Sequence, residues 1–327
     1  MLRVAVIGAG NMGKHHIRNY SEMPTSELVA ISDTNPERKE LAERYGCKFY
    51  TSYIEMLENE DIDAVSVVVP SKLHHEVSLE VINRGKHLLV EKPIAGTVKE
   101  AESIINAAKE KKVKLMIGHL ERFNPVIRKV KEIIDSGSLG EVVSIIARRV
   151  GGYPQNIKED NVLTDLAVHD IDIFNYLLGK EPKSVHCHNA NAMNSSRTNT
   201  AEILINYGGT GCVSQVNWIT PVKVRSIALT GTLGYLEIDN IKQELKLYTN
   251  GKFGPEFESY EEFLKTSTST QIEEIKIDKE EPLRNELESF INSISNDTKP
   301  LITGEDGLKA LRIAINALNG GDKNVYS

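Results

Sequence analysis

Short apolar runs rich in β-branched residues alternate with amphipathic segments over roughly the first 120 residues. Such alternation is typical of a parallel sheet covered by helices on both faces. Helix signals separate the runs: Asn35 precedes Pro36 as a cap before a first-turn proline, and Thr97 opens a charged amphipathic segment that ends near Lys111. We therefore predict a doubly wound α/β domain. Its strand-like runs are 3–7, 27–32, 64–69, 87–90 and 114–117.

The pattern changes after a predicted helix over 125–136. Strand-like runs now follow one another, and turn signals such as Tyr207-Gly-Gly-Thr-Gly211 predict hairpins. One helix with an acidic start interrupts the strands, and two helical segments, 283–295 and 305–318, end the chain. This half therefore reads as an α+β domain with a large, mostly antiparallel open sheet. Its strand-like runs are 142–150, 184–190, 201–206, 212–219 and 223–230.

The two patterns divide the 327 residues into a first domain over 1–121 and a second over 122–327, with C-terminal helices that could pack back on the first domain. The net charge of -7 argues against a nucleic-acid or anionic-membrane partner. The chain has no apolar run of membrane-spanning length and begins directly with strand-like sequence, so we expect a cytoplasmic protein. The widely spaced Cys47, Cys187 and Cys212 predict buried, reduced thiols.

Three glycines lie between the first predicted strand and the helix that follows it, at Gly8, Gly10 and Gly13. The first permits a tight turn, the second lets a pyrophosphate approach the backbone, and the third lets the helix pack closely on the strand. The helix N-terminus then faces the phosphates. Asn11 and Met12 complete the predicted phosphate loop.

Asp33 stands at the end of the second predicted strand, 20 residues after Gly13. An acid at this place hydrogen-bonds the adenosine ribose and repels a 2′-phosphate, which favours NAD over NADP. Arg38 lies close by in sequence and could reach a 2′-phosphate if Asp33 turned away, so NADP stays open as an alternative.

Two further motifs are Val69-Pro-Ser-Lys-Leu-His74 and Gly85-Lys-His-Leu-Leu-Val-Glu-Lys-Pro93. Together with the glycine loop and Thr164-Asp-Leu-Ala-Val-His-Asp-Ile-Asp172, they make the chain resemble the Gfo/Idh/MocA family over essentially its whole length. The resemblance implies an NAD(P)-dependent oxidoreductase that oxidises a sugar-like alcohol, or reduces a ketone, against the open sheet of its second domain.

The same resemblance implies roles for single residues. Lys92, in the family's Glu-Lys-Pro element, points at the substrate hydroxyl near the nicotinamide, where an ammonium can hydrogen-bond the reacting oxygen. Pro70, His74 and Glu91 are expected on the cofactor side, although a packed or capping role for His74 stays open. Arg122 and Asn124 match an interdomain segment, where they could contact substrate or fix the hinge.

The acidic helix carries the remaining candidate chemistry. At 100° per residue, Asp165, His169 and Asp172 share one face with Tyr176, while Asp170 falls within the apolar arc and needs a buried partner or a different helix geometry. A carboxylate one turn before a histidine can orient an imidazole that acts as general base.

The resemblance assigns those catalytic roles to Asp165 and His169. A metal site formed by the two acids and the histidine ranks second, because Lys92 can supply the electrophilic contact without a metal. A solvated polar face is the third interpretation. The family often has glycines where this chain has Asp160, Asn161 and Ala167, so the local backbone could differ from that of sugar dehydrogenases.

The run around the acidic helix looks most like members that oxidise the 3-hydroxyl of UDP-N-acetylglucosamine, with Tyr153 as a further substrate contact. Arg148, Arg149 and Lys158 could meet a diphosphate or face solvent. Three alternatives remain: an inositol or free-sugar dehydrogenase, an NAD-dependent glycosidase, and a cofactor-sensing regulator without catalysis. The family's usual assembly through the second sheet predicts a homodimer or homotetramer.

Overall fold

The computed structural model describes residues 1–153, 161–192, 197–249, 261 and 271–320, which form two compact units. The first unit comprises Met1–Phe123 and Glu281–Arg312, and the second comprises Asn124–Glu280 and Ile313–Ser327. The first unit is thus built from two separate chain segments, because α9 (Pro282–Ser295) packs against α1 (Asn11–Glu22). The division between the units falls within helix α10 (Gly304–Leu318), whose residues up to Arg312 belong to the first unit and whose residues from Ile313 belong to the second.

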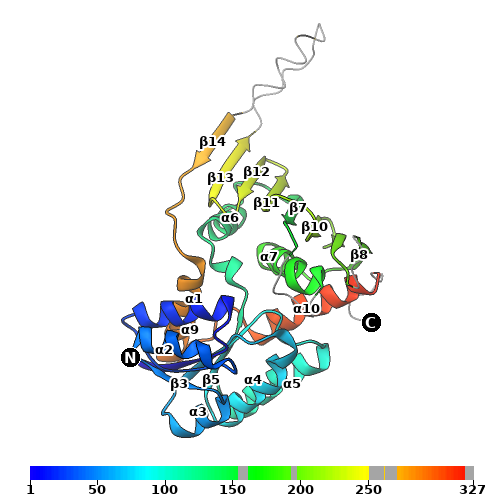
Figure 1. The fold of residues 1–327 in the computed structure, drawn as a ribbon. Helices are drawn as coiled ribbons and strands as arrows, with labels where there is room; N and C mark the ends of the chain where they lie inside the picture. Colours follow the sequence, from blue (N-terminus) through cyan, green and yellow to red (C-terminus); the bar gives the residue numbers. More distant parts are fainter. Residues whose placement is uncertain (154–160, 193–196, 250–260, 262–270, 321–327) are drawn as a thin grey trace. The chain divides into compact units, whose positions relative to one another are not determined.

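The first unit contains a six-stranded parallel sheet in the order β3-β2-β1-β4-β5-β6. Figure 1 labels β3 and β5 of this sheet. The strand order reverses between β1 and β4, which creates a crevice outside the carboxyl ends of these strands, where open α/β sheets bind ligands. The predicted doubly wound fold is confirmed. The strands are β1 (Leu2–Ile7), β2 (Ser26–Ser32), β3 (Lys48–Tyr50), β4 (Ala64–Val67), β5 (His87–Glu91) and β6 (Leu115–Gly118).

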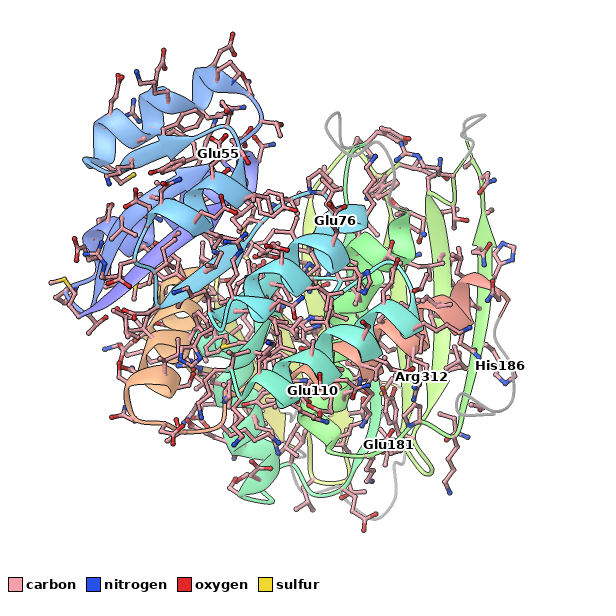
Figure 2. All side chains as sticks on the ribbon, turned by 90° about the horizontal axis from the view of Figure 1, so that it is seen from below. Glu55, Glu76, Glu110, Glu181, His186 and Arg312 are labelled. Atoms are coloured by element: carbon pink, nitrogen blue, oxygen red, sulfur yellow. The ribbon has the colours of Figure 1, made fainter. Side chains whose placement is uncertain are left out.

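Helices cover this sheet, and local sequence fixes where they begin. At the start of α5 (Val98–Lys111) the Thr97 hydroxyl accepts the Glu100 N–H at 3.2 Å, and the Glu100 carboxylate accepts the Thr97 N–H at 2.9 Å. Figure 2 labels Glu76 on α4 (His74–Asn83) and Glu110 on α5, two helices in contact with each other. The remaining helices of this unit are α2 (Lys39–Tyr45) and α3 (Tyr53–Asn59).

The second unit contains an eight-stranded sheet in the order β14-β13-β12-β11-β7-β10-β9-β8. Only the neighbours β7 and β10 are parallel, so the predicted mostly antiparallel sheet is confirmed. Figure 2 labels His186 on β8, at one edge. The strands are β7 (Val142–Val150), β8 (Ser184–Ala190), β9 (Thr200–Asn206), β10 (Gly211–Asn217), β11 (Val224–Gly231), β12 (Gly234–Asp239), β13 (Glu244–Thr249) and β14 (Gln271–Ile275).

One face of this sheet is buried beneath α7 (Val168–Leu178), which contacts β7 and β10, while α6 (Pro125–Asp135) packs against α7. Alternate residues of β9 and β10 point into this core, among them Ile203, Ile205 and Cys212. The opposite face carries exposed apolar side chains, including Ile146 and Leu204.

Four strands were not among the predicted ones. β3 has only three residues, and four of the five residues of β14 are exposed, so neither shows the apolar alternation that marks a half-buried strand. Of the three thiols, only that of Cys212 is fully buried, and burial raises its pKa to about 12. No helix in the described ranges is both long and apolar enough to cross a membrane.

Candidate active site

The glycine loop connects β1 to α1 in the first unit. Gly8 adopts φ +97°, and a Cβ at this position would lie 2.3 Å from the Val68 carbonyl oxygen. A Cβ on Gly13 would lie 2.0 Å from the Gly8 carbonyl oxygen, so these two glycines are required by backbone packing. A Cβ on Gly10 would meet nothing within 4 Å. The open space beside Gly10 is where a ligand can approach the backbone.

Asp33 follows β2 and joins the glycine loop to the next turn. Its Oδ2 accepts the Ala9 N–H at 2.7 Å, and its Oδ1 accepts the Asn35 N–H at 2.8 Å. The two hydrogen bonds hold the carboxylate in one orientation at the sheet edge.

A cavity of about 370 Å³ opens beside this carboxylate. Five of the predicted cofactor residues line it, together with residues that sequence reasoning missed, such as Thr51 and Tyr53. Asn11 and Met12 are the first two residues of α1 and are not among the lining residues. The five lining residues are Gly8, Gly10, Asp33, Arg38 and Pro70.

The Glu-Lys-Pro element follows β5. Glu91 is buried, and its Oε1 lies 3.1 Å from Nε2 of His16, a buried histidine on α1. Burial disfavours the charged form of Glu91, but the hydrogen bond with His16 and the electrostatic influence of His16, Lys92 and His74 hold its pKa below the ordinary 4.5. Lys92 itself is half-buried, and its backbone N–H lies 3.3 Å from Glu91 Oε2.

His74 begins α4 and is 1% exposed. Its Nδ1 lies 2.7 Å from the carbonyl oxygen of Pro93, and its Nε2 lies 2.9 Å from that of Val69. The ring therefore bridges the segments that follow β4 and β5, next to Lys92. This geometry agrees with the packed role left open for His74.

Arg122 and Asn124 are both buried. Arg122 Nη2 lies 3.3 Å from Oδ1 of Asp306 within the first unit. In the second unit, Asn124 caps α6 through Val126 N–H at 3.3 Å and donates to the Asn240 carbonyl at 3.0 Å. Each side chain is thus bonded within its own unit.

The acidic stretch begins with a wider helical turn than we assumed. Leu163–Ala167 form a π-helical turn, and α7 continues from Val168. Asn161 caps the turn, since its Oδ1 accepts the Leu163 and Thr164 N–H groups at 2.9 and 3.1 Å. Asp160, the residue before this cap, lies outside the described residues.

The wider turn contains one of the four side chains predicted to share a face, that of Asp165. Asp165, His169 and Tyr176 are half-buried, whereas Asp172 is fully buried. His169, Asp172 and Tyr176 lie within the regular helix α7, where 100° per residue applies, and Asp165 alone lies in the π-turn. Within the described ranges, no group of three or more His, Cys, Asp or Glu side chains could hold a metal ion.

Asp170 has the buried partner that its place in the apolar arc required. Its Oδ1 lies 2.7 Å from Arg149 Nε, and its Oδ2 accepts the Ser214 hydroxyl at 2.8 Å. Arg149 is 4% exposed. The suggested diphosphate contact for Arg149 is therefore wrong, because the charge is already matched inside the core.

The other two cations suggested for a diphosphate are placed differently. Arg148 lies on the opposite face of the sheet, where its Nε donates to Gln215 at 3.1 Å. Lys158 lies outside the described residues. Tyr153, by contrast, is 46% exposed and accepts a hydrogen bond from Arg197 at 2.8 Å.

Two family models match the chain. The model described as "Oxidoreductase family, NAD-binding Rossmann fold" matches residues 2–119, and the one described as "GFO/IDH/MocA C-terminal domain" matches residues 127–237. The chain belongs to the Gfo/Idh/MocA oxidoreductase family. The resemblance carried by the motifs is thereby confirmed.

Named relatives in this family cover nearly the whole chain. UDP-N-acetylglucosamine 3-dehydrogenase of Acidithiobacillus ferrooxidans is 25% identical over 96% of this chain and 95% of its own length. Inositol 2-dehydrogenase of Rhizobium meliloti is 29% identical over 96% and 94%. The solved structure of the A. ferrooxidans enzyme superposes with a TM-score of 0.85 at 26% identity, covering 96% of each chain.

Membership in the Gfo/Idh/MocA family makes this chain an NAD(P)-dependent oxidoreductase acting on CH–OH groups, with an NAD-binding first unit. The predictions of an enzyme and of NAD as its cofactor are confirmed. The residues present fit that cofactor, because the space beside Gly10 and the cavity at Asp33 lie together at the carboxyl edge of the parallel sheet.

Proposed function

We propose that this protein oxidises the 3-hydroxyl of a UDP-N-acetylhexosamine by hydride transfer to NAD. The whole-length likeness to UDP-N-acetylglucosamine 3-dehydrogenase, in sequence and in fold, carries this proposal. The inositol dehydrogenases among the relatives make oxidation of a polyol the second candidate, since they align over a similar share of the chain.

The first unit supplies Lys92 to this reaction. When bound, NAD accepts the hydride that leaves the carbinol carbon. Lys92 donates a hydrogen bond to the reacting oxygen and stabilises the charge that develops there. The preceding residue, Glu91, is buried and contacts His16, and His74 contacts the carbonyl of the following residue, Pro93. These contacts fix the backbone on either side of Lys92.

The second unit supplies Asp165 and His169. His169 takes the hydroxyl proton as general base, and Asp165, one turn earlier, orients the imidazole. The Asn161 cap and the buried Asp170–Arg149 pair fix the start of α7 from two sides.

Replacement of either group tests these roles. Lys92→Ala and His169→Ala should each lower kcat by about 100-fold or more, the usual contribution of a positioned proton-transfer group. His186→Ala, a histidine exposed on the edge strand β8, is the matched control and should retain full activity. Near-wild-type rates in both active-site variants would refute the assignment.

Substrate identity is tested by turnover with purified sugars. UDP-N-acetylglucosamine and NAD should yield stoichiometric NADH. Good activity on myo-inositol with none on the nucleotide sugar would reverse the ranking. Release of a free sugar without net NADH would indicate an NAD-dependent glycosidase, and no turnover of any sugar would favour a cofactor-sensing regulator.

We also propose that the protein assembles as a homodimer or homotetramer through the outer face of its second sheet. That face exposes 47% of Ile146 and 47% of Leu204, apolar area that association would remove from water. Light scattering coupled to size exclusion measures the mass, and a monomer at micromolar concentration would contradict the proposal.

A further inference from the structure

Three side chains of the second unit form a stacked cluster, here called the Arg197 platform: Tyr153, Arg197 and Trp218. The Arg197 guanidinium carbon lies 6.0 Å from the Tyr153 ring centroid and 5.8 Å from that of Trp218. The two rings meet edge to face, with centroids 5.7 Å apart and planes at 71°. Arg197 Nη2 also donates to the Tyr153 hydroxyl at 2.8 Å. The guanidinium is therefore held by stacking and by a hydrogen bond at once.

The platform lies where β7 and β10, the parallel pair, both end. Val150 and Asn217 are in register as the last residues of these strands, and Gly151 N–H donates to the Asn217 carbonyl at 3.1 Å. Tyr153 comes three residues after β7, and Trp218 follows β10 directly. Both aromatic residues thus follow the same ends of two neighbouring parallel strands.

Backbone hydrogen bonds tie Arg197 to the segment that presents Asp165. The carbonyl of Thr198, the next residue, accepts the Val162 N–H at 3.0 Å, and Val162 directly precedes the π-turn containing Asp165. Asn199 secures the other side, since its carbonyl accepts the Trp218 N–H at 3.0 Å and its fully buried amide bonds Ala192. The platform and the start of the acidic helix are one connected structure.

Two other arginines in this part of the sheet, Arg149 and Arg225, bond other groups of the protein. Arg149 is buried against Asp170, and Arg225 Nη1 donates to the carbonyls of Val150 and Val224, both at 2.7 Å. Arg148 lies on the opposite face. Arg197 is only half-buried and rests on Tyr153, which is 46% exposed, so part of the platform is open to solvent.

We propose that Arg197 binds the diphosphate of the nucleotide-sugar substrate, with Tyr153 and Trp218 fixing the plane of its guanidinium. This inference rests on the proposed function and deepens it by placing a phosphate subsite in the second unit. A planar guanidinium matches phosphate oxygens bidentately, and stacking reduces the side-chain entropy lost on binding. Arg197 holds a part of the substrate remote from the reacting hydroxyl, so it contributes to affinity more than to turnover.

The test uses the full-length protein and two readouts: UDP binding by calorimetry, which needs no turnover, and steady-state kinetics with UDP-N-acetylglucosamine and NAD. Arg197→Ala should weaken UDP binding and raise KM by about 10- to 100-fold, with kcat changed by less than about threefold. Arg197→Lys keeps the charge without the fork and should fall between wild type and Arg197→Ala. Arg148→Ala is the matched control and should bind UDP like wild type.

The outcomes separate the two proposals. If Arg197→Ala and Arg197→Lys both bind UDP as tightly as wild type, the subsite is wrong while the proposed function stands. If wild type neither binds UDP nor oxidises the nucleotide sugar, the proposed function fails and the subsite with it. Should Arg197→Ala unfold, Arg197→Lys decides: weakened UDP binding at an unchanged melting temperature supports the subsite, and unchanged binding overturns it.

Discussion

Asp170→Ala breaks a buried ion pair of the second unit. The variant leaves the Arg149 guanidinium 4% exposed without the carboxylate that lies 2.7 Å away, and it leaves the Ser214 hydroxyl without its acceptor at 2.8 Å. Breaking one side of a buried ion pair costs about 3–5 kcal/mol. Losing the hydrogen bond from Ser214 accounts for about 1 kcal/mol within that range. We therefore expect the free energy of unfolding to fall by about 3–5 kcal/mol.

Trp218 provides the assay, because it is the single tryptophan of the chain, is 3% exposed, and lies in the second unit. Urea unfolding followed by its fluorescence reports on this unit. Ser214→Ala should cost about 1 kcal/mol. The double variant Arg149→Met with Asp170→Leu replaces the pair by apolar side chains of similar size and should recover most of the stability.

Glu132→Ala, which removes an exposed ion pair with Lys129 in the same unit, is the control and should change little. A loss below about 1 kcal/mol for Asp170→Ala would refute the reasoning, since removing the carboxylate that faces a buried guanidinium should cost more than that. Equal losses for Asp170→Ala and the double apolar variant would show that packing, and not charge pairing, dominates at this position.

Three further predictions concern the first unit. Gly13→Ala should lower the melting temperature because its Cβ would lie 2.0 Å from the Gly8 carbonyl oxygen, whereas Gly10→Ala should keep it and raise the NAD dissociation constant by about tenfold or more, as calorimetry would show. Asp33→Asn removes the charge that opposes a 2′-phosphate, so the ratio of NADP to NAD dissociation constants should fall about tenfold; an unchanged ratio would exclude Asp33 as the selector. The pKa of Glu91 is lowered in the folded state, so its stabilising contribution is present above pH 4.5 and is lost as pH falls below it; Glu91→Gln should flatten that acid limb in unfolding measured from about pH 5 to about pH 3, and a limb as steep as in wild type would contradict this.

Much of the first unit follows from local sequence. Short buried strands, helix caps such as Thr97 and the close approach of Gly13 to the Gly8 carbonyl depend on interactions within a few residues, and those interactions are the same in any fold that contains the motif. The candidate roles of Lys92, Asp165 and His169 came from matching motifs, which mark chemistry without fixing distances.

Only the tertiary structure decided which distant groups meet. Helical periodicity marked Asp170 as an outlier that needed a partner, but its pairing with Arg149 depends on how α7 lies across the sheet. The π-turn at Leu163–Ala167 and the contact of His16 with Glu91 were likewise not predicted from the sequence, since His16 and Glu91 lie 75 residues apart in the chain. Periodicity reports the burial that each residue needs, whereas the choice of partner depends on contacts between elements far apart in the chain, which no local pattern contains.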